Sequence, residues 1–325
     1  MPFTVAHSPE EWISHFGGSR TAVTIGNFDG VHCGHHKIFK RVVERARRET
    51  CVAAALTFSP HPARVLRPEA APPMIETFAQ RIQRMQALGL DAVYVLRFDA
   101  AVASLSPQEF VERILTRSLH ARAVLVGENF RFGHRQAGNT LLLAELGRAH
   151  DFEVECVPYL TIRGIAVSSS AVRAAISAGQ MERAARLLGR PFALAGEIRT
   201  GTGTGRRFVF PTLNLATQQE SLPAHGVYAT EAVVNGKGYR AATNVGVRPT
   251  FEGTRLSIES HLFDFSEEIT SGPLEVRFWH RLREEQRFSG PEALREQIQR
   301  DLAATRSFFM RLDAARRIAK RTAAN

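Results

Sequence analysis

The sequence contains very little cysteine and no long apolar run. Its three cysteines, Cys33, Cys51 and Cys156, lie far apart in a chain of 325 residues. Such a sparse, odd set argues against a disulfide framework and is typical of a reducing compartment. No stretch approaches the roughly 18 apolar residues that a membrane span needs. The N-terminus also lacks the basic start and apolar block of a signal peptide. We therefore expect a cytoplasmic protein that does not bind a membrane.

Lysine is scarce as well, although the chain is strongly basic. The 42 basic residues face 32 acidic residues, which gives a formal charge of +10. All but Lys37, Lys40, Lys237 and Lys320 are arginines, and they are spread along helical stretches. A nucleic-acid-binding protein more often shows a clustered basic face, whereas excess positive charge also suits small anionic substrates such as nucleotides. Nucleic-acid binding stays a weaker alternative, and it predicts strongly salt-dependent binding.

The first half of the chain alternates between apolar runs and helical patterns. The apolar runs cover residues 21–26, 51–58, 92–98 and 123–127, and the helical patterns cover 34–49, 76–89 and 106–119. Residues 140–150 and 152–160 extend the alternation, and two short helices follow from Ser170 to Gly189. This order is typical of a parallel sheet covered by helices, so we predict a Rossmann-like α/β domain.

The second half of the chain has a different pattern of predicted secondary structure. From Phe192 to about Leu282, strand-like runs are separated by Gly, Pro and Asn, and no helical pattern intervenes. This predicts an antiparallel β-barrel or sandwich. A long helical pattern from about Pro291 to Lys320 closes the chain. The predicted fold class is α/β plus β, with domains at 1–187 and 188–325.

The stretch TIGNFDGVHCGHHKIF, residues 24–39, combines three histidines and a cysteine between a strand-like run and a helical pattern. His32 and His35 could face phosphates at the carboxyl end of the first strand, where open parallel sheets bind ligands and helix N-termini attract anions. The same side chains, with Cys33 and His36, could instead hold a metal, or the loop could carry no chemistry. The metal interpretation is weakest, because no second ligand pair lies at zinc-finger spacing.

A set of motifs in a fixed order resembles the bacterial bifunctional riboflavin kinase/FMN adenylyltransferase family, also called FAD synthetase. The first is the His-x-Gly-His loop at 32–35, which is shared with the nucleotidyltransferase superfamily. The others follow along nearly the whole chain: LTFSPHP (56–62), VGENFRFGHRQAGN (126–139), VSSSAVR (167–173), LLGRPFALAGEI (187–198), FPTLNL (210–215), TNVGVRPTF (243–251) and IESHLFDF (258–265).

The resemblance implies an adenylyltransferase in the first half. His32 and His35 would stabilise charge on the ATP phosphates and the leaving pyrophosphate. Arg173, one turn after a serine-capped helix start, would bind a phosphate. The residues implied in nucleotide or flavin binding are Gly26, Asn27, Phe28, Asp29, Gly34, Asn129, Ser169 and Ser170. Ser170 stands where the family usually has Thr, and it keeps the hydroxyl.

The resemblance implies a riboflavin kinase in the second half. A glycine-rich loop would fold over the ATP phosphates through Gly201, Gly203 and Gly205. Thr212 and Asn214 would offer oxygen ligands to Mg²⁺ or another divalent cation, since such hard ions prefer oxygen. Glu259 would be the base that accepts the proton of the riboflavin 5′-hydroxyl. From the bare sequence alone, Glu259 is more simply a solvent-facing carboxylate.

Two departures from the family pattern lie in the kinase half. Val209 replaces the usual Gly before Phe-Pro-Thr, and Thr270-Ser271 replaces a usual Tyr-Gly. The expected enzyme uses ATP, riboflavin, FMN and FAD as substrates or products and has no nucleic-acid partner. The main alternative is an FMN adenylyltransferase with a degenerate kinase module.

Overall fold

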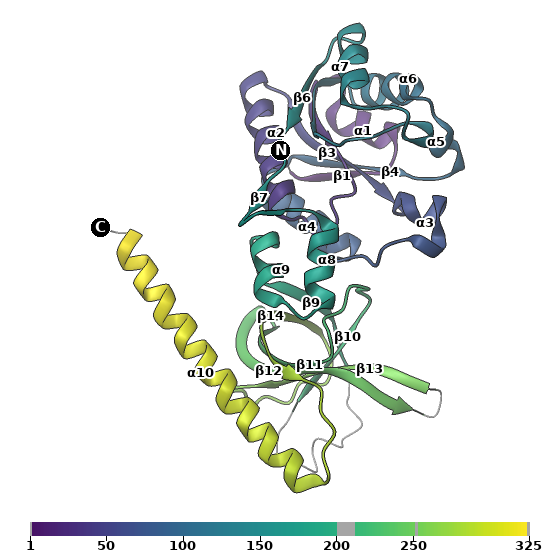
Figure 1. Ribbon diagram of the computed structural model, residues 1–325. Coiled ribbons are helices and arrows are strands. Elements are labelled where there is room, and N and C mark those ends of the chain that lie inside the picture. Colours follow the sequence, from purple (N-terminus) through teal and green to yellow (C-terminus); the bar gives the residue numbers. More distant parts are fainter. Residues whose placement is uncertain (1, 200–211, 251–252, 324–325) are drawn as a thin grey trace. The chain divides into compact units, whose positions relative to one another are not determined.

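Short buried strands of the first half run side by side and parallel, as their apolar runs predict. The computed structural model in Figure 1 describes residues 2–199, 212–250 and 253–323. Its first compact unit, Met1–Ala171, contains a six-stranded sheet in the order β1-β4-β3-β2-β5-β6 with every pair parallel. The strands are β1 (Thr4–Ala6), β2 (Thr21–Ile25), β3 (Val52–Ser59), β4 (Ala92–Arg97), β5 (Ala121–Gly127) and β6 (Glu153–Val157), and β7 (Thr161–Ile162) pairs with β8 (Ile165–Ala166) as a separate hairpin. The predicted Rossmann-like α/β fold is confirmed.

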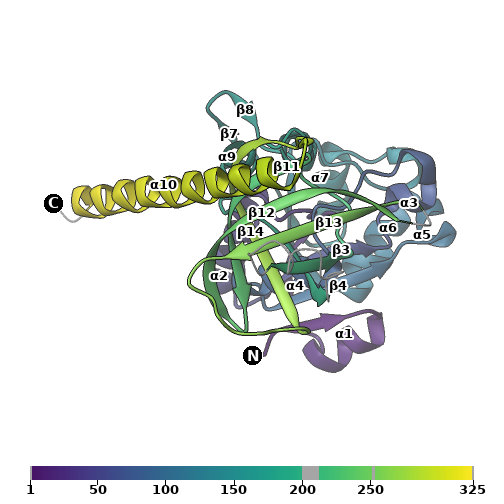
Figure 2. The same ribbon diagram turned by 90° about the horizontal axis from the view of Figure 1, so that it is seen from below.

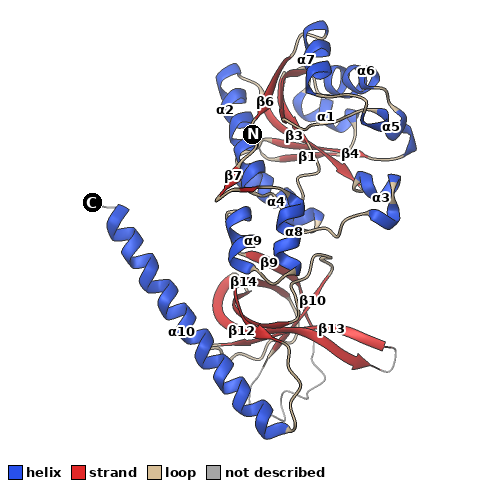
Figure 3. Cartoon of the chain, viewed as in Figure 1, coloured by secondary structure: helices blue, strands red, loops and turns tan. Residues whose placement is uncertain are grey.

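Helices cover both faces of this sheet (Figure 3). Side chains alternate along each strand, so Leu56 of β3 packs in one core with Trp12, whereas its neighbour Ala55 packs in a second core with Phe39. The helices are α1 (Pro9–Phe16), α2 (Cys33–Glu49), α3 (Pro62–Leu66), α4 (Phe78–Ala87), α5 (Ala100–Ser104), α6 (Pro107–Phe110) and α7 (Thr140–Ala149), with 3₁₀ turns η1 (Pro68–Ala70) and η3 (His134–Gln136) and a π-helical segment η2 (Val111–Ser118).

Most of these elements agree with the sequence patterns, and the differences are local. The expected helix at 106–119 starts as predicted, because Ser106 and Glu109 form a capping box. After Phe110, however, it continues as the π-helix η2 rather than as an α-helix. Strand β1 and helix α1 were not expected, since a strand of three residues carries almost no periodic signal.

The carboxylate of Asp91 ties three elements of this unit together. It accepts two hydrogen bonds of 2.7 Å from the Arg47 guanidinium, at the end of α2, and one of 2.8 Å from the backbone N–H of Ala53. Burial alone would raise the pKa of Asp91, but the hydrogen bonds from Arg47 and Ala53 outweigh it, and the pKa is lowered. Helix α2, which begins at the histidine loop, is therefore clamped to the sheet at its far end.

This lowered pKa predicts a pH-dependent contribution to stability. A carboxyl group whose pKa is lower in the folded state stabilises the protein above its unfolded pKa, about 3.9, and loses that contribution as the pH falls through the folded value. Replacing Asp91 by Asn should lower the free energy of unfolding by about 1–3 kcal/mol at pH 7. Urea unfolding at pH 7 and at about pH 3 should show this difference shrinking at the lower pH. An equal difference at both pH values would mean that the charge of Asp91 contributes nothing.

The second compact unit, Val172–Asn325, is built on a closed antiparallel barrel (Figure 2). The strand order is β10-β13-β12-β11-β14-β9, and β9 pairs with β10 to close the ring. The strands are β9 (Phe192–Arg199), β10 (Leu213–Thr217), β11 (Gly226–Val234), β12 (Lys237–Thr250), β13 (Gly253–Leu262) and β14 (Pro273–Glu284). Helix α10 (Pro291–Ala323) packs outside the barrel against β11, β12 and β14. The predicted barrel and long terminal helix are confirmed.

Two short helices precede the barrel, as expected. They are α8 (Ser169–Ser177) and α9 (Met181–Leu188), and α9 contacts β9 and β14. The division of the chain between the two compact units falls within α8, after Ala171. The boundary after residue 187 stays a prediction about where the catalytic domains can be separated.

Hydroxyl groups form a chain inside the barrel. The side chains of Thr230 and Thr243 lie 2.6 Å apart, and those of Thr243 and Ser260 lie 2.8 Å apart. All three residues are fully buried. Because side chains alternate across a strand, the inward position of Ser260 places its neighbour Glu259 on the outer face of the barrel.

Candidate active sites

The loop between β2 and α2 lies where the order of the parallel sheet reverses. Strand β2 has β3 on one side and β5 on the other, and the chain builds the sheet outward from this point in both directions. Ligands of open α/β sheets bind at the carboxyl ends of the strands beside such a switch point. The sequence therefore placed the histidine loop correctly, and the N-terminus of α2 adds the positive end of its helix dipole there.

His32 and His35 cap this helix reciprocally. The Nδ1 atom of His32 accepts a hydrogen bond of 3.3 Å from the backbone N–H of His35, and Nδ1 of His35 accepts one of 3.3 Å from the N–H of His32. The two rings stack with centroids 3.6 Å apart and 13° between their planes. Since each Nδ1 is an acceptor, each neutral ring carries its proton on Nε2. The pair is thus fixed as two Nε2–H donors, which is the form that can hydrogen-bond phosphate oxygens.

Two glycines leave room for aromatic rings in this loop. A Cβ atom on Gly34 would lie 3.1 Å from Cε1 of the His32 ring, and one on Gly26 would lie 3.0 Å from the Phe28 ring. Side chains at these positions would displace the rings. The predicted roles of Gly26 and Gly34 in ligand binding stay predictions, but both glycines have a packing reason.

The carboxylate of Asp29 is an internal anchor. Asp29 is 1% exposed, and its oxygens accept hydrogen bonds of 3.1 Å from the N–H of Ile75 and 3.3 Å from that of Glu76. Its backbone carbonyl accepts a hydrogen bond of 2.9 Å from the Ser169 hydroxyl. Asp29 thus holds the histidine loop against the segment before α4 and against the start of α8. Its predicted contact with a nucleotide or flavin stays a prediction.

A cavity of about 1400 Å³ opens beside this loop. The predicted residues Gly26, Asn27 and Asn129 line it, whereas His32 and His35 are not among its lining residues. Its walls include three arginines and five phenylalanines: Arg67, Arg131, Arg135, Phe58, Phe98, Phe110, Phe130 and Phe132. Aromatic walls suit planar ring systems, and arginines suit phosphates. The amide Oδ1 of Asn27 is buried without a hydrogen-bond partner, which leaves an unused acceptor at the wall.

The serine motif starts a helix, as the sequence indicated. The hydroxyl of Ser168 accepts a hydrogen bond of 3.2 Å from the N–H of Ala171, so Ser168 caps α8. Ser169 binds Asp29, and Ser170 is exposed. Arg173 lies on α8 within the second compact unit. The phosphate-binding roles of Ser170 and Arg173 stay predictions.

The metal interpretation of the histidine loop finds no support. Across the described ranges, no group of three or more His, Cys, Asp or Glu side chains is arranged to hold a metal ion. Both Nδ1 atoms of the histidine pair are occupied by the reciprocal caps. Nothing therefore favours a metal centre over phosphate binding at this loop.

In the barrel, register brings the predicted kinase residues together. Glu259 of β13 is paired directly with Asn214 of β10 on one side and with Asn244 of β12 on the other. Side chains of directly opposed residues share a face, with Cβ atoms about 4.5–5.5 Å apart. The Ser257 hydroxyl donates a hydrogen bond to the half-buried Glu259 carboxylate. The side chains of Glu259, Asn214 and Asn244 thus form one polar patch on the outer face, the Glu259 patch.

Asn244 is the residue of this patch that sequence reasoning missed. It lies in the motif TNVGVRPTF, but only the strand register shows that it faces Glu259. Thr212 comes directly before β10. The glycine-rich loop with Gly201, Gly203 and Gly205, and the departure Val209, lie outside the described residues. The structure does not test their predicted roles.

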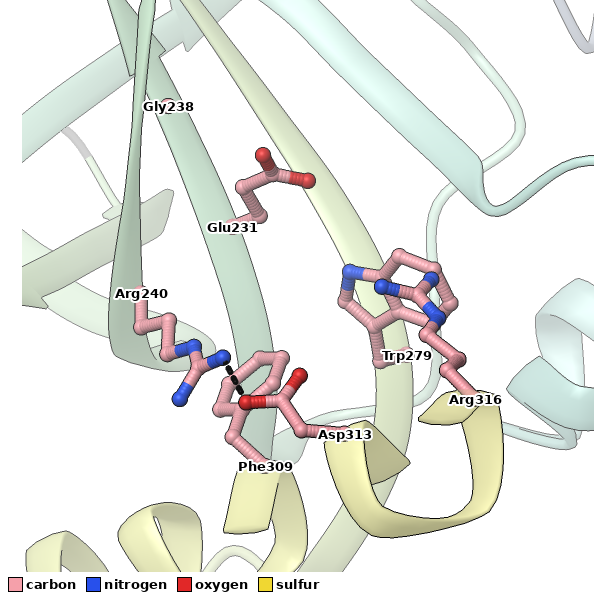
Figure 4. Close-up of a pocket in the computed structure, with 7 residues that line it drawn as sticks. All are labelled: Glu231, Gly238, Arg240, Trp279, Phe309, Asp313 and Arg316. Carbon is pink, nitrogen blue, oxygen red and sulfur yellow. Dashed lines mark hydrogen bonds and ion pairs between the residues drawn. The ribbon is translucent and has the colours of Figure 1, made fainter. Parts of the chain in front are cut away.

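A second pocket, of about 170 Å³, lies between α10 and the outer face of the barrel (Figure 4). Its lining residues are Glu231, Gly238, Arg240, Trp279, Phe309, Asp313 and Arg316. Asp313 forms an ion pair with Arg240, and the Arg316 guanidinium stacks over the Trp279 ring at 4.7 Å from its centroid. These contacts link α10 to the barrel, and the pocket shares no residue with the Glu259 patch.

Comparisons with known proteins decide the family. A family model described as FAD synthetase matches residues 17–171, and one described as riboflavin kinase matches residues 188–309. The bifunctional riboflavin kinase/FMN adenylyltransferase of Escherichia coli (strain K12) is 34% identical over 288 residues, which cover 88% of this chain and 92% of that protein. This chain belongs to the bifunctional riboflavin kinase/FMN adenylyltransferase family.

Other relatives agree over the same length. The family member from Pseudomonas fluorescens is 38% identical over 285 residues, which cover 87% of this chain and 91% of that protein. A crystal structure described as a macrolide-efflux protein from Streptococcus pneumoniae superposes with a TM-score of 0.82 at 28% identity, covering 94% of this chain and 99% of that one. In the part of this chain that the structure describes, no helix has the length and apolar character to cross a bilayer. The family assignment rests on the sequence matches.

Proposed function

We propose that the N-terminal unit transfers AMP from ATP to the phosphate of FMN, which gives FAD and pyrophosphate. The observation that carries this proposal is the stacked histidine pair, fixed as two Nε2–H donors at the sheet's switch point. Adenylyl transfer needs positioning and stabilisation of charge on leaving oxygens more than a covalent intermediate. The large cavity beside the loop offers phenylalanine walls for the ring systems of flavin and adenine.

The barrel in this proposal phosphorylates riboflavin with ATP. Glu259 accepts the proton of the riboflavin 5′-hydroxyl as the phosphoryl group leaves ATP. Asn214, directly opposite Glu259, and Thr212 offer oxygen atoms that suit Mg²⁺ or another divalent cation. When bound there, such an ion would neutralise charge on the ATP phosphates. The Ser257 hydroxyl, by donating to Glu259, orients the carboxylate on the outer face.

One assay tests both halves of the proposal. Purified protein is incubated with riboflavin, ATP and Mg²⁺, and riboflavin, FMN and FAD are then separated. Formation of FMN followed by FAD supports a bifunctional enzyme of small-molecule substrates, which we propose to be cytoplasmic. If FMN is converted to FAD but riboflavin is never phosphorylated, the alternative of a degenerate kinase module holds. Val209 and Thr270, which depart from the family pattern, are the reason for considering it. Binding of DNA or RNA without either reaction would support the alternative of a nucleic-acid-binding protein.

A fragment tests whether the two reactions are separable. Residues 1–187 should convert supplied FMN to FAD and should not phosphorylate riboflavin, because the fragment keeps the histidine loop and Arg173 but lacks the barrel. It should be less stable than the full chain, since Met181, Ala184 and Leu187 of α9 are buried in the full chain beside the barrel strands. Circular dichroism and an FMN-to-FAD assay check this. A folded fragment without FAD formation would count against independent sites.

A further inference from the structure

The buried guanidinium of Arg81, on α4, contacts the backbone at the start of the histidine loop. Arg81 is 6% exposed, and its Nη1 atom donates a hydrogen bond to the backbone carbonyl of Asn27. The Thr57 hydroxyl donates to the same carbonyl at 3.4 Å. The peptide group between Asn27 and Phe28, in the loop, is therefore held by a charged donor from helix α4.

A contribution to folding stability does not by itself explain why a charged side chain is buried at position 81. Burial lowers the pKa of Arg81, although the nearby Asp29 and Glu76 carboxylates oppose that effect. The Nε atom of Arg81 is buried without a hydrogen-bond partner. Asp29 accepts backbone N–H groups, and Glu76 is paired with Arg84, so neither depends on Arg81 alone. Whole buried ion pairs can often be replaced by apolar residues of similar size without loss of stability, so a buried charge is weak evidence for a stabilising role.

The peptide that Arg81 holds leads into a strained backbone. Phe28 has a φ of 49° and Val31 a φ of 36°, a region that is costly for bulky and β-branched residues. Such strain persists only where surrounding contacts impose it, and it gathers at functional sites. The hydrogen bond from Arg81 to the Asn27 carbonyl fixes the peptide plane directly before Phe28, so it is one of the contacts that impose this conformation.

The strained conformation places the Phe28 ring against the histidine pair. The ring meets the His35 imidazole edge-on, with centroids 5.2 Å apart, and packs on Phe39 with centroids 4.8 Å apart. His35 in turn stacks on His32. An unbroken series of contacts thus runs from the Arg81 guanidinium through the Asn27–Phe28 peptide to both histidines.

We propose that Arg81 is a positioning residue for adenylyl transfer, acting on His35 through the Asn27–Phe28 peptide and the Phe28 ring. Arg81 touches no reacting atom in this account, and it sets the direction of the Nε2–H donors. The inference rests on the proposed FMN adenylyltransferase activity. It predicts an effect on the chemical step that exceeds the effect on ATP binding.

The test uses the full chain with Arg81→Met and Arg81→Lys. For Arg81→Met, kcat for FAD formation from FMN should fall about tenfold to a hundredfold, the cost of a misplaced catalytic group, while KM for ATP changes little. Arg81→Lys, which keeps a cation and a donor, should recover part of the loss. Circular dichroism reports whether the α/β unit is still folded, and riboflavin phosphorylation by the same preparation shows that the barrel is intact.

The matched control is Arg84→Met, one turn further along α4. Arg84 pairs with Glu76 but has no hydrogen bond to the histidine loop among those of the described residues. It should lose stability without a comparable fall in kcat. If Arg84→Met and Arg81→Met reduce kcat equally, or if Arg81→Met keeps the wild-type kcat, the positioning role is wrong. A wild-type protein that makes no FAD would instead overturn the proposed function.

A double-mutant cycle tests the proposed route and remains informative if Arg81→Met does not fold. Phe28→Leu should lower kcat in the same way, because it removes the ring edge that meets His35. Combined with Arg81→Lys, it should add little further loss, since residues on one route are not additive. Fully additive losses, or an unchanged kcat in Phe28→Leu, would show that Arg81 does not act through Phe28.

Discussion

Replacing both His32 and His35 by Ala should abolish FAD formation, while FMN accumulates from riboflavin. Loss of one donor aimed at transition-state charge typically costs about 10²–10³ in rate, and this change removes two. It also removes both reciprocal caps of α2, each worth about 1 kcal/mol of stability. Separation of the flavins after incubation with riboflavin and ATP measures the outcome.

Two further variants separate capping from catalysis. His32→Asn keeps an oxygen acceptor for the helix N-terminus, because Asn is among the best N-cap residues, but it lacks the imidazole Nε2–H. It should therefore remain as stable as the wild type and still lose FAD formation. His36→Ala changes a neighbouring histidine outside the stacked pair and should retain activity. FAD formation at the wild-type rate in the double alanine variant, or zinc that is lost with these residues, would show that phosphate binding is wrongly assigned.

Replacing Glu259 by Gln should abolish FMN formation from riboflavin and leave FAD formation from supplied FMN intact. Gln keeps the size and much of the hydrogen bonding, but it cannot take up the proton of the substrate hydroxyl. Loss of a general base typically costs about 10²–10⁴ in rate, whereas loss of a solvent-facing carboxylate without a catalytic role would change the rate very little. The result is the mirror image of the histidine variant. The intact activity of the unchanged half shows that each preparation is competent, and circular dichroism shows whether the changed half is folded.

A second carboxylate on the barrel provides a matched control. Glu231 of β11 also lies on the outer face, 3.7 Å from Arg277, but it lines the pocket beside α10 rather than the Glu259 patch. Glu231→Gln should phosphorylate riboflavin normally. Equal losses in both variants would indicate damage to the barrel rather than a missing base. If the wild type never phosphorylates riboflavin, the kinase assignment itself fails.

The sequence predicted the layers of both units because buried strands and amphipathic helices leave periodic signals over many residues. Strand β10 was missed as a strand, since its five residues follow the glycine-rich segment and were interpreted only as a motif. The polar patch needed strand register, which is set by long-range pairing. Glu259 was found through family resemblance, and Asn244 emerged only when its pairing with Glu259 was known.

The histidine loop shows a different limit of sequence reasoning. Its position at the end of the first strand follows from alternation, and the motif indicates phosphate binding. The reciprocal caps depend on side-chain rotamers and on Gly34, whose missing Cβ leaves room for the His32 ring. The inward turn of Asp29 toward Ile75 depends on a segment 46 residues away. Neither feature leaves a local pattern from which it could be deduced.

The placement of the two tryptophans has a spectroscopic consequence. The sequence has two tryptophans; Trp12 lies fully buried in the core of the α/β unit, and Trp279 lies on the barrel beneath the Arg316 guanidinium. Each unit thus carries one tryptophan in a different environment. In Trp279→Phe and Trp12→Phe variants, emission during thermal melting would follow one unit at a time. Coincident melting curves would show that the two catalytic halves unfold together, and separate curves would show that one can open while the other stays folded.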